Sequence, residues 1–262
     1  MKGQYWVFDL YVLGSSSDGN CIYVDCGDTK LLLDCGLSFK QTKSKLHEIG
    51  ASLSNIDYVL ITHEHADHIQ CLKQLVDNYN IKAIASRGTL SKIDIPEFNK
   101  LYIRDRQELQ LPNLIMEAKK INHDALEPLC FLITNSVNEK MLYLTDCGMA
   151  RYLKFKDCDI YIVEANFYLE QLELNYRTNR IHKVQYDRAL SGMGHLSLED
   201  SIEFLKNNIG ENTKEVILSH LSPVNANRDL FRQRAKKQLS FDSIHIAEEG
   251  LYIKYGVNPQ PF

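Results

Sequence analysis

Hydrophobic and polar positions along the chain follow two periodicities. Short runs rich in β-branched and aromatic residues predict strands, and segments with apolar residues every three or four positions predict helices. Helices are expected at 38–49, where Ser38 and Gln41 fit a capping box, and at 69–78, 197–209 and 228–239. Strands are expected at 5–13, 21–25, 30–33, 56–61, 81–85, within 101–121, and at 129–134, 140–145, 159–166 and 214–218, with a closing strand pair at 244–247 and 251–255.

This alternation continues without a linker rich in Pro, Ser or Gly, a repeat or a low-complexity segment. The pattern therefore predicts a single domain over residues 1–262. Residues 168–190 are polar and aromatic and are expected to form two helical pieces. Their basic side chains, interleaved with tyrosines, suit either a phosphate backbone or a solvated helix face: Arg177, Arg180, Lys183 and Arg188.

The segment Thr62–His68 reads T-H-E-H-A-D-H, directly after the strand-like run at 56–61 and before a helical segment. In a turn between strand and helix, three imidazoles and a carboxylate can converge. Imidazole nitrogen and carboxylate oxygen together suit zinc and similar divalent ions. The alternative interpretation is a polar turn that is rich in histidine by chance.

Further acidic and imidazole side chains follow other strand-like runs. Asp34 follows 30–33, and because a buried acid must be paired, we expect it on the second N–H of a metal-ligating His, with a turn Asp as the alternative. His123 follows the run ending at 121, and His220 follows 214–218. Asp146 follows 140–145, where a carboxylate could bridge two cations about 3.5–4 Å apart. The alternatives are a solvated loop His and an Asp-Cys-Gly turn.

Composition narrows the functional classes. A formal net charge of −4 gives no overall basic field for nucleic acid, so any polyanion contact would be local or carried by metals. No apolar run reaches the length of a membrane span, and the first residues lack a signal-peptide pattern. The seven cysteines are scattered without a C-x-x-C pair, which favours free thiols in a reducing cytoplasm.

A set of motifs runs along the chain in the order G-S-S-S-D-G-N, L-L-D-C-G-L-S, T-H-E-H-A-D-H-I, H-D-A-x-E-P, T-D-C-G, E-A-N, G-H-L-S and S-H-L-S-P-x-N. This set resembles the YycJ/WalJ-like exonuclease branch of the metallo-β-lactamase-fold hydrolases, related to ribonuclease Z and the phosphonate-pathway phosphodiesterases. The resemblance implies an α+β fold, the αββα four-layer sandwich with two mixed β-sheets face to face and helices outside. Residues 146–195 are too few for the cap domain of β-CASP nucleases, and the exosite arm of ribonuclease Z has no obvious counterpart.

The resemblance also implies roles for individual residues. Two divalent ions, Zn²⁺ or Mn²⁺, would be held by His63, His65 and His123 at one position and by Asp67, His68 and His220 at the other, with Asp146 between them. Asp34 and Thr62 are expected behind these ligands. His195 resembles the histidine that contacts the scissile phosphate in ribonuclease Z, with Glu164 held behind it. Residues expected to bind substrate are Ser15, Ser16, Asn20, Ser197 and Asn166, although the segment around Asn166 departs from the family pattern.

The expected function is a phosphodiesterase, most simply an exonuclease acting on single-stranded nucleic acid, with DNA favoured. A water molecule activated by the two ions would attack phosphorus, Asp67 would orient it, and His195 would bind a phosphate oxygen or protonate the leaving oxygen. The nearest alternative is a phosphodiesterase for cyclic nucleotides or another small molecule, and a less favoured one is a lactone or thioester hydrolase. The expected partner is a nucleic acid or nucleotide substrate rather than a membrane, and a homodimer is compatible with the sequence.

Overall fold

The structure is a computed structural model that describes residues 8–255. Within this range the strands form two mixed seven-stranded sheets, as the sequence predicts. The first three residues of the strand expected at 5–13 lie outside the described range, and the strand itself is β1, Phe8–Gly14. None of the helices within residues 8–255 combines the length and apolar character needed to cross a membrane.

The chain divides into two compact units. The first comprises residues 1–119, 125–140 and 248–262, and the second comprises residues 120–124 and 141–247. The expectation of one domain over 1–262 stays a prediction.

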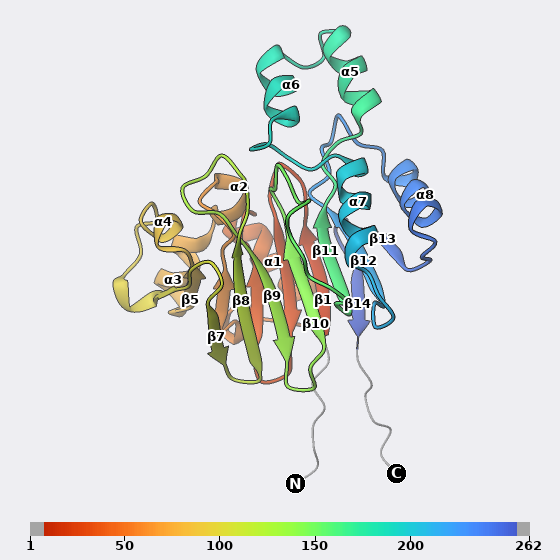
Figure 1. The fold of residues 1–262 in the computed structure, drawn as a ribbon. Coiled ribbons are helices and arrows are strands. Elements are labelled where there is room, and N and C mark those ends of the chain that lie inside the picture. The colour runs from red at the N-terminus through yellow and green to blue at the C-terminus, as the bar shows by residue number, and fades with distance from the viewer. Residues whose placement is uncertain (1–7, 256–262) are drawn as a thin grey trace. The chain divides into compact units, whose positions relative to one another are not determined.

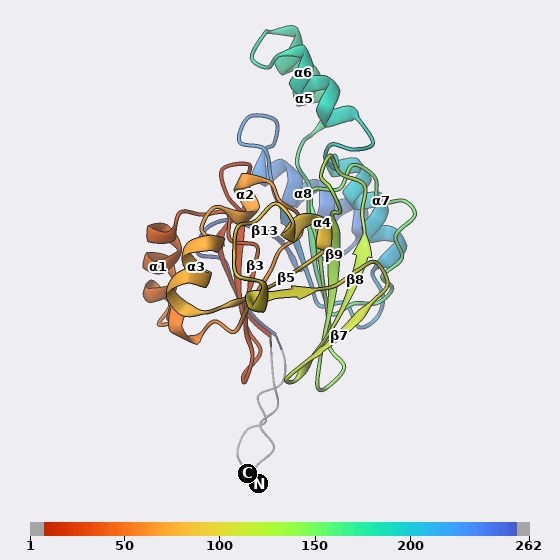
Figure 2. The ribbon, with the colours of Figure 1, turned by 90° about the vertical axis from the view of Figure 1, so that its left-hand side faces the viewer.

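The first unit contains a complete sheet with the order β14-β1-β2-β3-β4-β5-β6. Its strands β3, β4, β5 and β6 run parallel, so their carboxyl ends meet at one edge. Helices α1 and α3 cover this sheet through Leu46, Leu72 and Leu75, which pack with Leu32 and Val59 (Figure 2). The strands are β2 Cys21–Asp25, β3 Lys30–Leu33, β4 Tyr58–Leu60, β5 Lys82–Ala85, β6 Lys100–Tyr102 and β14 Tyr252–Tyr255.

The remaining elements of the first unit include three strands of the second sheet, in the order β9-β8-β7. These are β7 Glu108–Leu111, β8 Leu114–Lys120 (whose last residue belongs to the second unit) and β9 Leu129–Asn135. The helices are α1 Phe39–Glu48, α2 Ala66–Ile69, α3 Leu72–Tyr79 and α4 Arg87–Leu90, with short helical turns at Leu53–Asn55 and Glu97–Asn99.

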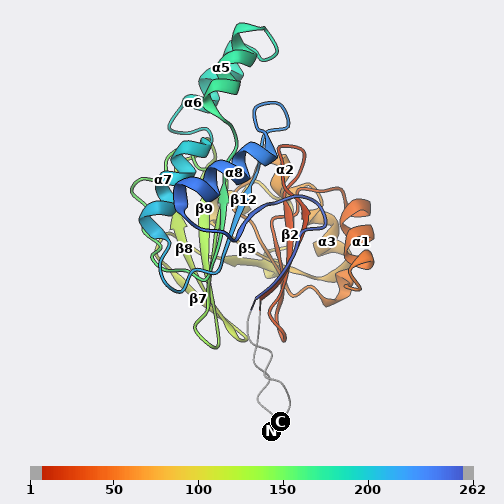
Figure 3. The same ribbon diagram turned by 90° about the vertical axis from the view of Figure 1, so that its right-hand side faces the viewer.

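The second unit is built on four parallel strands in the order β13-β12-β11-β10. Every residue of β11, Ile160–Glu164, is buried, as expected for a parallel strand covered on both faces. Helices α7 and α8 pack on each other, and α8 contacts β13 (Figure 3). The bounds are β10 Lys140–Leu144, β12 Glu215–Ser219, β13 Ile244–Ile246, α7 Leu198–Asn208 and α8 Arg228–Leu239.

Helices α5, Leu169–Arg177, and α6, Lys183–Leu190, form a hairpin between β11 and α7. They lie beyond the carboxyl ends of the second unit's strands (Figure 1). A small apolar cluster holds the hairpin together, with Leu172, Ile181 and Ala189 at its centre. Tyr176 and Tyr186 stack beside it with ring centroids 4.5 Å apart.

Two sequence predictions about elements were wrong. The segments 244–247 and 251–255 do not pair, because β13 lies parallel to β12 whereas β14 lies antiparallel to β1. The helix expected at 69–78 is not continuous: the short helix α2 ends at Ile69, and α3 begins at Leu72, after an interruption at Cys71. There the Cys71 N–H donates to the carbonyl of Cys35, so a contact with another segment replaces helix hydrogen bonding.

Candidate metal centre

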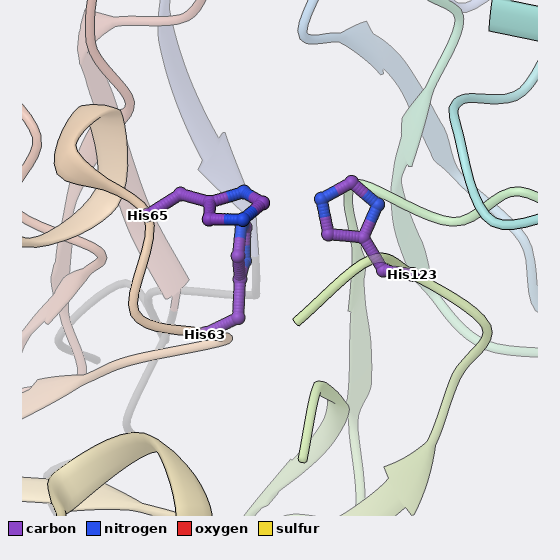
Figure 4. Close-up of side chains that lie close together, drawn as sticks. All are labelled: His63, His65 and His123. Carbon is purple, nitrogen blue, oxygen red and sulfur yellow. The ribbon is translucent and has the colours of Figure 1, made fainter. Parts of the chain in front are cut away.

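In the first unit, the histidine-rich segment crosses from β4 into α2. His65 keeps an extended backbone as the residue before α2, so Asp67 and His68 fall in the helix and His63 stays outside it. The rings of His63 and His65 meet edge to face, with centroids 4.5 Å apart (Figure 4). The His68 ring lies 4.2 Å from that of His63, and both side chains are fully buried. The break between strand and helix therefore gathers three imidazoles that a continuous helix would separate.

Asp34 fixes the orientation of the His68 ring. Its Oδ2 lies 2.8 Å from Nδ1 of His68, and its Oδ1 accepts the Thr62 N–H at 2.9 Å. Since an ionised carboxylate only accepts, Nδ1 carries the proton and Nε2 keeps its lone pair. The Asn20 amide nitrogen lies 3.2 Å from that Nε2 and can donate to it. His68 thus has the tautomer of a metal-ligating histidine held by a carboxylate.

In the second unit, His123 has the same tautomer through a different partner. Its Nδ1 lies 3.0 Å from the main-chain carbonyl oxygen of Gly194, which can only accept. Its Nε2 therefore has the lone pair, 3.7 Å from Oδ1 of Asp146. Burial lowers the pKa of His123 and outweighs the nearby carboxylates, which favours the neutral ring that a metal requires.

Asp146 and His220 follow β10 and β12 at the same edge of the parallel strands. Oδ2 of Asp146 lies 3.4 Å from Nε2 of His220. Both residues adopt a left-handed backbone, with φ of 49° and 55°, which costs on the order of 1–3 kcal/mol each for residues other than glycine. The Asn166 amide fixes the His220 ring, since its nitrogen donates to the His220 carbonyl at 2.9 Å and lies 3.0 Å from Nδ1.

Glu164 is fully buried behind His195. Its Oε1 lies 2.7 Å from Nδ1 of His195, and its Oε2 accepts the N–H groups of Cys147 at 2.8 Å and Leu196 at 3.2 Å. Burial alone would raise the pKa of Glu164, but His195 outweighs it and holds the pKa below its ordinary value. Burial likewise opposes charge on His195, yet Glu164 and Asp146 outweigh it and raise the pKa of His195 to about 10.

The donor set fits divalent metal ions. Ligand-type atoms of Asp146, Glu164, His195 and His220 all lie within 4.8 Å of one another in the second unit. Because both oxygens of Glu164 accept hydrogen bonds, we assign Glu164 to organising this cluster rather than to ligation. The first unit supplies imidazole and carboxylate donors of the same kind. Nitrogen and oxygen donors in this mixture suit zinc or manganese.

The residues expected to bind substrate have partners of their own. Ser16 Oγ accepts the Asp18 N–H at 3.1 Å, and Ser197 caps α7 by accepting the Asp200 N–H. Asn20 and Asn166 lie beside His68 and His220, as described above, and the Ser15 side chain is half-buried. Substrate binding by these five residues stays a prediction.

Comparison with known proteins identifies the family. The model of the beta-lactamase superfamily domain matches residues 29–221. The chain belongs to this superfamily. The exodeoxyribonuclease WalJ of Streptococcus pneumoniae serotype 2 (strain D39 / NCTC 7466) is 31% identical over 247 residues, which cover 89% of this chain and 88% of WalJ. The exodeoxyribonuclease YycJ of Bacillus anthracis is 29% identical over 245 residues, which cover 90% of this chain and 91% of YycJ.

A solved structure agrees with the family assignment. The metallo-β-lactamase fold protein YhfI from Bacillus subtilis matches with a TM-score of 0.71 at 17% identity, covering 95% of this chain and 99% of YhfI. The metallo-β-lactamase fold and the resemblance to the YycJ/WalJ branch are therefore confirmed. The chain is a hydrolase of the metallo-β-lactamase superfamily with a cluster that could bind metal.

Sequence reasoning missed some of the groups that orient the superfamily's histidines in this chain. The Gly194 carbonyl holds His123 across 71 positions of sequence, and a main-chain carbonyl has no sequence signature. Asn20 and Asn166 were expected to bind substrate, and their contacts with the rings of His68 and His220 were not anticipated. Asn20 directly precedes β2, and Asn166 lies two residues after the end of β11. These positions at strand ends could have suggested this role.

Replacing Glu164 by Gln should destabilise the second unit strongly. The amide keeps the shape of the side chain. In one orientation its NH₂ group would face the main-chain N–H donors of Cys147 and Leu196, and in the other it would leave His195 without an acceptor. We expect a loss of about 3–5 kcal/mol in the free energy of unfolding, measured by urea denaturation. Glu173→Gln on α5, where the carboxylate pairs with Arg177 at the surface, should stay within about 0.5 kcal/mol of the unmodified protein. Equal losses in both variants would contradict the role given to Glu164.

Replacing Gly194 by Ala should weaken metal binding through His123. A Cβ at Gly194 would lie 1.9 Å from the Arg188 carbonyl oxygen, so the segment that holds His123 must move. We expect zinc affinity to fall about 10–100-fold in a chelator competition assay, the usual cost of losing such a partner. Gly192→Ala is the matched control, because its Cβ would meet only Met149 Cε at 3.5 Å. Unchanged zinc affinity in Gly194→Ala would rule out this account of His123.

Proposed function

We propose that this chain is a two-metal-dependent phosphodiesterase, specifically an exonuclease acting on single-stranded nucleic acid, with DNA favoured. The observation that carries the proposal is the match to two exodeoxyribonucleases, which extends along nearly the full length of this chain and of each relative. The ligand-type residues of the sequence motifs are all present, and His68 and His123 have acceptors at Nδ1 that suit ligation through Nε2. Action in the cytoplasm belongs to the same proposal, and a homodimer is compatible with it.

The proposed ligands follow the order of the family's motifs. His63, His65 and His123 would hold one ion, Asp67, His68 and His220 the other, and Asp146 would serve both. The ions, zinc or manganese, would lower the pKa of a water molecule and offset the negative charge that builds on the phosphate. Asp34, Gly194 and Asn166 would keep His68, His123 and His220 in fixed orientations.

His195 would bind a non-bridging phosphate oxygen or donate a proton to the leaving oxygen. Its Nδ1 is taken by Glu164 and lies 3.2 Å from Oδ1 of Asp146, so Nε2 is the nitrogen left for the substrate. Two carboxylates beside the ring favour the imidazolium form, which suits a phosphate better than a lactone or thioester carbonyl. Asp67 would orient the attacking water while serving as a ligand.

A second candidate is a phosphodiesterase for cyclic nucleotides or other small substrates. The net charge of −4 favours it, because an acidic protein repels a long polyanionic strand more strongly than a compact nucleotide. The chemistry and the roles of His195 and Glu164 would be the same.

The proposal is tested with manganese-loaded protein, a 5′-phosphorylated single-stranded DNA oligonucleotide and, in parallel, 3′,5′-cyclic nucleotides. We expect stepwise shortening of the oligonucleotide, with His195→Ala lowering kcat about 10²–10⁴-fold and leaving metal content unchanged. His47→Ala, an exposed histidine on α1, is the control and should keep full activity.

Other outcomes separate the candidates. An intact oligonucleotide beside opened cyclic nucleotide would replace the exonuclease by the second candidate. Full activity of His195→Ala on either substrate would contradict the phosphate-facing role of His195. Hydrolysis of a lactone or thioester alone would contradict the phosphodiesterase proposal as a whole.

A further inference from the structure

The loop that carries His123 is fastened to the end of the α5–α6 hairpin by main-chain hydrogen bonds. His123 Nδ1 donates to the Gly194 carbonyl at 3.0 Å, and the Asp124 N–H donates to the Met193 carbonyl at 3.1 Å. On the other side, the Gly148 N–H donates to the Asn122 carbonyl at 2.7 Å. The position of the His123 ring therefore depends on where residues 188–194 lie.

Close backbone contact leaves little freedom to this arrangement. A Cβ added to Gly148 would lie 2.4 Å from the main-chain carbon of Gly192, and one added to Gly194 would lie 1.9 Å from the Arg188 oxygen. Real Cβ atoms do not approach other atoms so closely. Gly148 thus lets its loop pack directly against the end of the hairpin, and Gly194 lets residues 188–194 fold back closely on themselves.

One side-chain contact joins the same two segments. The Arg188 guanidinium makes a two-armed (bidentate) contact with the Asp124 carboxylate: Nε donates to Oδ2 at 2.8 Å, and a terminal nitrogen donates to Oδ1 at 2.9 Å. Arg177 and Lys183 pair with acids on their own helices, at Glu173 and Asp187, whereas Arg188 reaches out of α6. Both side chains are partly exposed, so the pair adds little stability, but a two-armed contact fixes orientation.

The Asp124 carboxylate lies next to the atom that would bind metal. Its Oδ1 is 3.2 Å from Nε2 of His123, and with Nδ1 protonated both atoms present lone pairs. Two such atoms repel each other unless a cation or a donor compensates them. Arg188 supplies a fixed donor that holds the carboxylate in place.

We propose that Arg188 is a positioning residue of the metal centre: through Asp124 it fixes the His123 loop and the negative charge beside His123 Nε2, and so sets metal affinity at that position. The inference deepens the proposed function and rests on metal binding, whatever the substrate. It gives a specific role to a basic residue that the sequence pattern leaves between a phosphate contact and a solvated helix face.

The test is zinc titration of metal-free protein by calorimetry, with Arg188→Ala, Arg188→Lys and Arg177→Ala compared with the unmodified chain. Arg188→Ala should weaken one binding event about 2–5-fold and leave the other unchanged. Lysine should recover part of the loss, since it keeps the charge but not the two-armed contact. Arg177→Ala removes the same charge from the hairpin and should bind zinc normally.

A double variant shows whether Arg188 acts through Asp124. If it does, Asp124→Ala and the variant carrying both changes should have the same zinc affinity, because the second change removes nothing further. At saturating metal, Arg188→Ala should regain kcat with KM unchanged. Additive losses, or a raised KM with normal zinc affinity, would overturn the inference and point to a substrate contact.

The failure of this inference is distinguishable from that of the proposed function. Normal zinc affinity in Arg188→Ala, in a protein that does bind zinc, overturns the positioning role alone. An unmodified chain that binds neither zinc nor manganese overturns both.

Discussion

A carboxylate without solvent exposure organises the candidate site in the second unit. Glu164 ends the buried strand β11, and it accepts hydrogen bonds from the turn after β10 and from the segment before α7. Cys147 N–H fixes the turn after β10, Leu196 N–H and the His195 ring fix the approach to α7, and His220 Nδ1 lies 3.4 Å away after β12. A buried charge is tolerated only when it is fully paired, so the position of each of these groups follows from the need to pair Glu164.

Three of the residues with a left-handed backbone follow core strands, one in the first unit and two in the second. Asp34, Asp146 and His220 each follow a strand and each adopt a positive φ, of 55°, 49° and 55°. Such conformations persist only where surrounding contacts determine them, and here Thr62 holds Asp34 while Asn166 holds His220. The left-handed turn directs a side chain across the strand ends where a continued strand would direct it into a sheet face. The strain is therefore part of how the fold presents its polar side chains.

Much of this could be predicted from sequence, for a physical reason. Apolar runs indicate strands, and a His or Asp directly after such a run must lie where the strand leaves the sheet. That reasoning placed His63, Asp146 and His220 after strands, and it paired Asp34 with a histidine, which the structure shows to be His68. The motif resemblance led to the family that the comparisons then confirmed.

The remainder depends on groups that leave no trace in sequence. The partner of His123 is a main-chain carbonyl, and the fork between Arg188 and Asp124 joins residues 64 positions apart. The last two strands were expected to pair because they are neighbours in the chain, but a turn of a few residues also lets each join a different sheet. Local periodicity predicts that a strand forms, but it does not predict which other strand it pairs with.

The most direct test is a crystal structure of zinc-loaded protein with anomalous diffraction data at the zinc edge. The account predicts two zinc peaks per chain, with His68 and His123 binding through Nε2 while their Nδ1 atoms remain on Asp34 and the Gly194 carbonyl. Coordination through Nδ1 of either ring, or zinc bound away from these residues, would contradict it.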